Sequence, residues 1–129
     1  MEVHRSDAVT SAFGGGHFTG RVHLDTLLDE PGDDGMRLYR VVFEPGARTN
    51  WHRHPGGQAL FVLAGTARVG VEGSTQMAGT GDVVYSAPNE WHWHGADAGG
   101  VMMHLAVNPG GKTEWGDDRP VTDEEYRSV

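Results

Sequence analysis

The feature that most constrains the fold is a series of short strand-like runs between residues 18 and 107, each ended by a turn. Glycine and proline mark these turns, as in Pro45-Gly46 and Pro55-Gly56-Gly57. No stretch keeps an apolar pattern of helical period over several turns. Many short strands at close spacing predict an all-β sandwich, jelly roll or barrel. The expected strands are Phe18 to Leu27, Met36 to Phe43, Gln58 to Leu63, Thr66 to Val71, Asp82 to Tyr85, Trp91 to His94 and Val101 to Val107.

The two ends of the chain differ from this middle part. Residues 1–17 have a glycine-rich end and predict an irregular N-terminal arm, laid over a barrel edge or a neighbouring subunit. We expect residues 18–110 to form the barrel and residues 111–129 to form a C-terminal tail. Within the tail, Glu125 follows three residues after Thr122, which is the pattern of a capping box and predicts one short C-terminal helix.

Composition excludes several kinds of site and partner. The chain has no cysteine, so any metal must be bound by nitrogen and oxygen. A formal net charge of −8 argues against nucleic acid as a partner, because phosphate binding requires a basic face. We find no apolar run of membrane-spanning length and no secretory leader. We therefore expect a single-domain cytoplasmic protein that acts on a small molecule, with neither nucleic acid nor a membrane as partner.

Histidines dominate the middle of the sequence, where five of the eight lie between positions 52 and 104. In His52-Arg53-His54 the two imidazoles leave the same face of an extended strand. Gln58 follows the next turn, and a bend there can return its amide oxygen toward both imidazoles. The spacing repeats in Trp91-His92-Trp93-His94, with histidines on one face and tryptophans on the other. Neutral imidazole is the commonest metal ligand, and burying several imidazoles together without a cation would be costly.

These patterns predict a metal site built from the histidines and Gln58. His4, His17 and His23 lack such spacing, and we expect each of them to be an ordinary core or surface residue.

Two segments resemble the motifs of the cupin family. Gly46, His52-Arg53-His54, Gln58 and Gly65 match the spacing of the first cupin motif, and residues 81–92 are similar to the second. The chain departs from the family pattern at Gln58, where the usual residue is glutamate. It also departs where Ala87 and Asn89 replace the expected proline and glycine, with Pro88 shifted by one. Asn89 can adopt the left-handed conformation that glycine would, so we expect this turn to persist.

A closer resemblance is to the small bacterial cupins with manganese-dependent hydroxynitrile lyase activity. It is carried by residues 43–49, Gln58, residues 92–95, residues 103–106 and residues 121–126. The resemblance implies a cupin jelly-roll β-barrel, a homodimer and a Mn(II) ion. The ligands that it implies are His52, His54, His92 and Gln58. Ligation by nitrogen and oxygen also suits Fe(II), Zn(II), Ni(II) or Co(II).

A glutamine ligand changes the electrostatics of such a site. It leaves both charges of a divalent ion uncompensated, which makes the ion a stronger electrophile toward an alkoxide, cyanide or enolate. The alternative is that Gln58 turns away and the three histidines bind alone. His94 and His104 are the catalytic candidates, as the acid or base that moves a proton to or from the substrate. The alternative role for both is to orient the ligands through hydrogen bonds.

For the remaining pocket residues, only the alternation of side chains along a strand indicates which of them face inward. Of Tyr39 and Arg40, whichever faces inward could contact a substrate, as could Asn108. Trp51, Trp91 and Trp93 are opposite in phase to the histidines, so we expect them to pack behind the site or at a dimer contact. About half of the apolar candidates should face inward; they are Val41, Phe61, Leu63, Val69, Val71, Met102 and Leu105.

Four functions are compatible with these patterns. The first is a metal-dependent lyase that acts on cyanohydrins or similar hydroxy and carbonyl compounds. The second is a metal-dependent dioxygenase that cleaves an aromatic or alkene substrate, and the third is a cyclase or isomerase of secondary metabolism. The fourth is a non-catalytic sensor or sugar-binding protein, which the complete ligand set disfavours. The resemblance favours the lyase.

Overall fold

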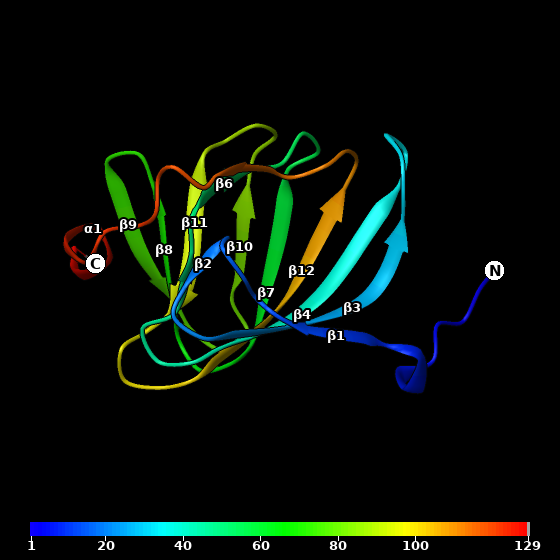
Figure 1. Cartoon of the computed structure of the whole chain (residues 1–129), viewed down its shortest axis with the longest axis horizontal. Helices are drawn as coiled ribbons and strands as arrows, with labels where there is room; N and C mark the ends of the chain where they lie inside the picture. Colours follow the sequence, from blue (N-terminus) through cyan, green and yellow to red (C-terminus); the bar gives the residue numbers. More distant parts are fainter. Residues whose placement is uncertain (129) are drawn as a thin grey trace.

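A computed structural model describes residues 1–128 of the chain. Two antiparallel β-sheets face one another as a sandwich whose sheets do not close into a continuous barrel (Figure 1). The first sheet has the strand order β1-β3-β4-β12-β7-β10. Its strands are β1 (Thr10–Phe13), β3 (Val22–Glu30), β4 (Met36–Phe43), β7 (Gln58–Ala64), β10 (Val83–Ser86) and β12 (Met102–Pro109).

The second sheet has the order β13-β6-β11-β5-β2, and β8 pairs with both β11 and β9. Its strands are β2 (Phe18–Thr19), β5 (Arg48–Thr49), β6 (Trp51–Arg53), β8 (Ala67–Val71), β9 (Ser74–Ala78), β11 (His92–Ala96) and β13 (Glu114–Gly116). This arrangement confirms the prediction of an all-β cupin fold. Among residues 1–128, no helix has the length and apolar character needed to span a bilayer.

The C-terminal helix forms where the sequence predicts it. Helix α1 (Asp123–Arg127) begins after Thr122, whose hydroxyl accepts a hydrogen bond from the backbone N–H of Glu125 at 3.1 Å. The Glu125 carboxylate in turn accepts from the backbone N–H of Thr122 at 3.2 Å. This reciprocal capping box satisfies two backbone donors that a helix start otherwise leaves unpaired. The only other helical segment in the described chain is the 3₁₀ turn η1 (Ser6–Ala8).

The structure differs from the predicted strands at several places. The expected run Phe18 to Leu27 is two strands in different sheets, because the chain turns at Gly20 with φ of 81°. The arm is not wholly irregular, since β1 pairs with β3 along the edge of the first sheet. Strands β5, β9 and β13 were not expected either, and β13 lies in the predicted tail, where it pairs with β6.

Alternation along β12 places one row of side chains between the sheets. Met102, His104, Ala106 and Asn108 are buried, whereas their neighbours along the strand are half-buried. At one end of the sandwich this interior is apolar, with Phe43 and Met102 fully buried. The inward-facing histidines lie beside this apolar core, so their imidazole rings contact apolar side chains on one side.

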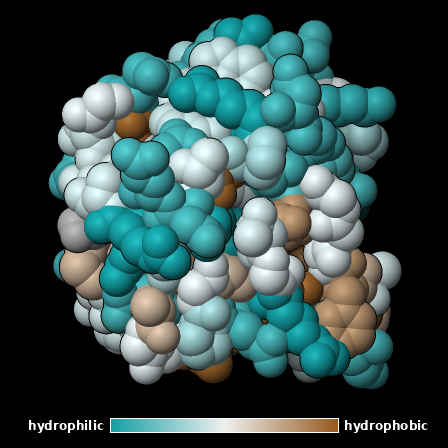
Figure 2. All heavy atoms as spheres, turned by 60° about the vertical axis from the view of Figure 1, so that its left-hand side comes forward, coloured by the Kyte–Doolittle hydropathy of each residue, from teal (hydrophilic) through white to brown (hydrophobic). Residues whose placement is uncertain are grey.

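A second apolar cluster lies on the outer side of the second sheet. It contains Trp51, Trp93, Val121 and Tyr126, so helix α1 covers the back of β6 and β11. The tryptophans therefore pack behind the histidines, as their opposite phase predicts. The face of the molecule turned toward the viewer in Figure 2 is largely hydrophilic, with apolar side chains in small separate groups.

Candidate metal centre

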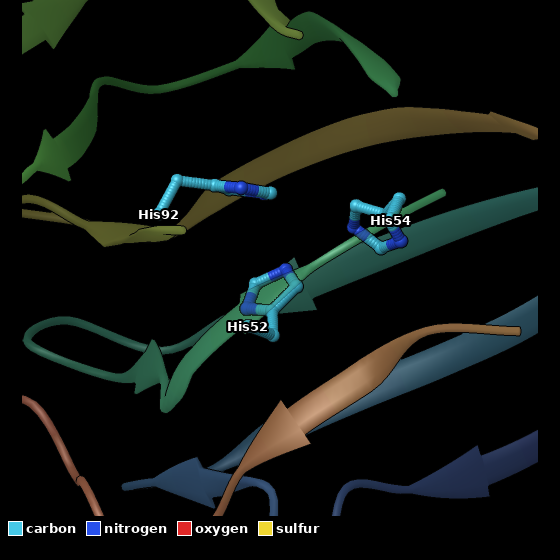
Figure 3. A group of neighbouring side chains, drawn as sticks. All are labelled: His52, His54 and His92. Carbon is cyan, nitrogen blue, oxygen red and sulfur yellow. The ribbon is translucent and has the colours of Figure 1, made fainter. Parts of the chain in front are cut away.

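Three histidines converge between the sheets. His52 lies in β6, His54 directly follows that strand, and His92 opens β11, where it is the cross-strand partner of His52. One ring nitrogen from each lies within 4.8 Å of the others, and all three residues are buried. Figure 3 shows the imidazole rings turned toward one another. These three side chains form a site able to hold a metal ion.

Backbone hydrogen bonds fix which nitrogen of each ring faces the centre. Nδ1 of His52 lies 2.8 Å from the carbonyl oxygen of Asn50, and Nδ1 of His92 lies 2.8 Å from that of Glu90. A carbonyl oxygen can only accept, so Nδ1 carries the hydrogen in both rings. The Nε2 atoms of His52 and His92 therefore present lone pairs, which is the tautomer that a metal requires.

His54 completes the set in a different way. Its Nδ1 is 3.0 Å from the hydroxyl of Thr113, and its buried Nε2 has no hydrogen-bond partner within residues 1–128. A buried polar nitrogen without a partner is unfavourable unless a ligand satisfies it. Its orientation therefore fits a cation at the centre.

Burial keeps these imidazoles neutral. Loss of hydration, together with the positive charges of His92 and Arg37, lowers the pKa of His54 to about 3. Burial likewise lowers the pKa values of His52 and His92. A neutral imidazole has the free lone pair that a metal ligand needs, so all three rings are ready to bind a cation at neutral pH.

Gln58 lies at the start of β7 with its amide oriented by a neighbour. Its Nε2 donates a hydrogen bond of 2.9 Å to Oδ1 of Asn108, and its Oε1 lies 3.1 Å from Nε2 of His92. Both atoms of the second pair are acceptors when His92 is neutral. Two opposed lone pairs of this kind are the surroundings that a cation would stabilise, so the donor set fits a divalent ion without a carboxylate.

His94 and His104 continue the histidine row deeper into the sandwich. Nε2 of His94 is 3.3 Å from Nε2 of His52, and Nδ1 of His94 is 3.0 Å from Nε2 of His104. Since Nε2 of His52 presents a lone pair, His94 donates to it and accepts from His104. Burial lowers the pKa of His104 to about 4 and that of His94 well below its usual value. Nδ1 of His104 is buried without a partner.

A cavity of about 210 Å³ adjoins this histidine row. Tyr39 and Asn108 line it, whereas Arg40 faces the other way and binds Asp25 with a nitrogen–oxygen distance of 2.8 Å. The apolar part of the cavity wall comes from both sheets and consists of Phe18, Leu24, Val41, Phe43, Ala106 and Trp115.

Most of the apolar residues expected to line the pocket lie elsewhere. Among them only Val41 lines this cavity. Phe61 is 41% exposed, and Leu105 is its cross-strand partner on the outer face of the sheet. Val69 and Val71 line a separate cavity on the other side of His92 and His94.

Several lining residues were missed by sequence reasoning. Trp115 and Thr113 lie in the predicted tail, and Phe18 and His17 lie where the arm meets the barrel. They reach the site because β13 and β2 both pair with the chain segment that carries His52. The aromatic character of Phe18 and Trp115 was the available signal, since no motif marks these residues.

Comparison with known proteins agrees with this geometry. A family described as "Cupin domain" matches residues 39–113. The (R)-mandelonitrile lyase of Granulicella tundricola is 42% identical over 132 residues, covering 98% of this chain and 99% of the relative.

Solved structures show the same likeness. A cupin-like protein from Thermotoga maritima shares 41% identity with a TM-score of 0.79, over 95% of this chain and 88% of its own. The polyketide cyclase RemF from Streptomyces resistomycificus shares 21% identity with a TM-score of 0.71, over 98% and 91% respectively, which is a likeness of fold.

Proposed function

The chain belongs to the cupin family, and from that membership and its histidine geometry we propose that it is a metal-dependent lyase that cleaves cyanohydrins into an aldehyde and hydrogen cyanide. The observation that carries the proposal is the convergence of the Nε2 atoms of His52, His54 and His92 with Oε1 of Gln58. The similarity to a mandelonitrile lyase over nearly the whole chain supports the choice of reaction.

We assign Mn(II) as the metal and these four side chains as its ligands. A divalent ion held there supplies a Lewis acid for the hydroxyl oxygen of the substrate. Because none of the four ligands is a carboxylate, the protein leaves the positive charge of the ion available to a developing alkoxide. The apolar wall of Phe43, Val41 and Leu24 excludes water beside the reacting carbon.

His94 and His104 provide the proton path. Their 3.0 Å contact is a hydrogen bond in either direction. A metal on Nε2 of His52 would use the lone pair to which His94 otherwise donates. His94 would then donate from Nδ1 to His104 and leave its own Nε2 free to accept the proton of the substrate hydroxyl. The carbon–carbon bond then breaks, its electron pair leaves with cyanide, and the imidazolium of His94 returns the proton to give hydrogen cyanide. The remaining oxygen and carbon form the aldehyde.

The proposed assembly is a homodimer. Val83 and Phe61 are cross-strand partners on β10 and β7, and both side chains are exposed on the outer face of the first sheet together with Tyr85. An exposed apolar group at a sheet edge is a usual place for pairing with a second copy. Light scattering on Phe61→Lys and wild-type protein tests this assembly, because a lysine there would separate the two copies.

The lyase proposal is tested by following benzaldehyde release from mandelonitrile with Mn(II)-loaded protein, after mass spectrometry has confirmed the metal content. The control is the double variant His52→Ala, His54→Ala, since the uncatalysed reaction also releases aldehyde. We expect metal-dependent release that the double variant lacks. No release from the loaded protein would contradict the proposal, and oxygen uptake with aromatic substrates would then favour the dioxygenase alternative.

A further inference from the structure

His17 lines the cavity, and contacts with two neighbouring side chains fix the orientation of its imidazole ring. Its imidazole stacks on the indole of Trp115 with ring centroids 4.1 Å apart and planes 10° from parallel. Its Nδ1 lies 2.8 Å and 3.0 Å from the two carboxylate oxygens of Asp117. Trp115 in turn lies 4.6 Å from the ring of His52, so one aromatic ring separates His17 from a proposed metal ligand.

The carboxylate determines which side of the His17 ring is free. Asp117 is an acceptor only, and its Oδ1 also accepts a 3.0 Å hydrogen bond from Nδ2 of Asn50. Nδ1 of a neutral His17 must therefore carry the hydrogen, which leaves the lone pair on Nε2. No hydrogen bond of this Nε2 is found within residues 1–128, and the residue lines the cavity.

Three other polar side chains of the cavity are already engaged, whereas Nδ1 of His104, deeper in the sandwich, is not. The hydroxyl of Thr113 pairs with His54, the hydroxyl of Thr49 accepts from the backbone of His94, and Gln58 donates to Asn108. His17 is thus a hydrogen-bond acceptor with a fixed orientation. Binding of a substrate therefore costs little side-chain entropy at this residue. Tyr39 is the other lining residue whose hydroxyl has no partner within the described chain, so it is the necessary comparison.

We propose that Nε2 of His17 accepts a hydrogen bond from a hydroxyl group on the ring of an aromatic substrate, so that the site prefers hydroxylated aromatic aldehydes and their cyanohydrins. The cavity of about 210 Å³ is smaller than most ligand pockets and suits a single substituted ring. The aromatic side chains that line the cavity contact the substrate ring, and Nε2 of His17 recognises its hydroxyl group. The inference rests on the proposed function for the reacting group but not for the binding of the ring.

The first test measures binding of aromatic aldehydes to metal-loaded protein by calorimetry. The hydroxyl probes are meta-hydroxybenzaldehyde and para-(hydroxymethyl)benzaldehyde. Each is compared with benzaldehyde and with its own methyl ether, which accepts hydrogen bonds but donates none. We expect at least one hydroxyl probe to bind about tenfold more tightly than its ether, as one well-placed hydrogen bond allows.

Two variants separate His17 from its surroundings. His17→Phe keeps a flat ring on Trp115 and should abolish the tenfold difference while benzaldehyde binding is retained. Tyr39→Phe removes the competing hydroxyl and should leave the difference unchanged. A difference that survives His17→Phe, or that is lost in Tyr39→Phe, would overturn the proposal.

Asp117→Asn gives a readout that a merely structural role for His17 would not move. The asparagine oxygen can keep the hydrogen bond from Asn50 while its amide N–H donates to Nδ1 of His17. The hydrogen of the imidazole then moves to Nε2, which becomes a donor. We expect this variant to bind the methyl ethers more tightly than wild type does, and unchanged ether binding would contradict the assignment.

Cyanohydrin cleavage distinguishes this inference from the proposed function. A protein that selects hydroxyl probes but releases no aldehyde from any cyanohydrin would contradict the lyase alone. A protein that cleaves mandelonitrile but shows no hydroxyl preference in binding would contradict the role of His17 alone.

Discussion

Nε2 of His92 and Oε1 of Gln58 lie 3.1 Å apart, although neither atom carries a hydrogen when His92 is neutral. The hydrogen of His92 is on Nδ1, 2.8 Å from the carbonyl oxygen of Glu90, and the amide hydrogens of Gln58 face Asn108. The protein thus holds two lone pairs against each other at a buried position. A shared cation between them would convert this repulsion into two attractive contacts, which is why we assign Gln58 as a ligand.

Replacing Gln58 with glutamate tests that assignment. The carboxylate would add a negative charge at nearly constant shape, and Asn108 can turn its amide to donate to it. We expect Gln58→Glu to bind Mn(II) at least about tenfold more tightly, as a close charge pair in a buried site allows, and to cleave mandelonitrile more slowly. The slower reaction follows because the carboxylate cancels one charge of the ion that activates the substrate oxygen.

Chelator competition measures the metal affinity of this variant, and benzaldehyde release measures its rate. The matched control is Gln76→Glu, which makes the same charge change on an exposed residue of β9 and should alter neither quantity. A Gln58→Glu variant with wild-type affinity and rate would show that only the three histidines bind.

Metal binding should stabilise the fold. A ligand at about a hundred times its dissociation constant raises the free energy of unfolding by about 2.7 kcal/mol. We expect this increase in urea unfolding of wild-type protein with Mn(II) and none in the His52→Ala, His54→Ala variant. The control is His4→Ala, His23→Ala, which removes two histidines with more exposed side chains. An equal increase in both double variants would place the bound metal outside the proposed site.

The sequence predicted that His52, His54 and His92 converge because strand alternation is a local rule. Residues two apart share a face, so the pairs His52 with His54 and His92 with His94 converge once the strands pair. The fold class was predicted from the same local signals, because nearby glycine and proline residues mark each turn.

The cavity wall was predicted poorly because it depends on contacts that no local pattern encodes. Strand β7 has apolar residues on both faces, so its apolar pattern alone does not show that Leu60 faces inward and Phe61 outward; only the inward Gln58, two residues before Leu60, indicates it. Strands β2 and β13 are two and three residues long, too short for any alternation to appear. Their place is set by pairing with β5 and β6, which brings Trp115 to His52 from a distance in the chain.

The stability of the metal-free protein should fall as the pH falls below 6.5, partly because of His104. Burial holds its folded-state pKa at about 4, against the usual histidine pKa of 6.5. Between these values the unfolded chain binds the proton and the folded protein does not, so the free energy of unfolding rises with pH through this window. The contribution is complete above pH 6.5 and amounts to about 3 kcal/mol, all of it lost by the time the pH reaches about 4.

His104→Gln removes this titration and keeps a donor for Nδ1 of His94. We expect urea unfolding of the chelator-treated variant to depend less steeply on pH, by about 1.4 kcal/mol per pH unit within the window. His4→Gln, on an exposed side chain, should keep the slope of the wild type. An unchanged slope in His104→Gln would mean that this imidazole titrates alike in the folded and unfolded states.

The contact of Tyr126 with the back of the second sheet should contribute to stability but not to metal affinity. Its hydroxyl donates a 2.7 Å hydrogen bond to the backbone oxygen of Ala96, and its ring lies between the guanidinium groups of Arg48 and Arg68, at 4.7 Å and 4.5 Å. Tyr126→Phe removes the buried hydrogen bond and keeps the ring packed beside Trp93. We expect a loss of about 1 to 2 kcal/mol in the free energy of unfolding, with metal affinity unchanged.

Tyr126→Ala also removes the ring and should lower the free energy of unfolding by about 3 to 5 kcal/mol. Tyr85→Phe, which alters a 68% exposed tyrosine, should match wild type. If Tyr126→Phe unfolds with the wild-type free energy, the hydrogen bond to Ala96 does not contribute to stability.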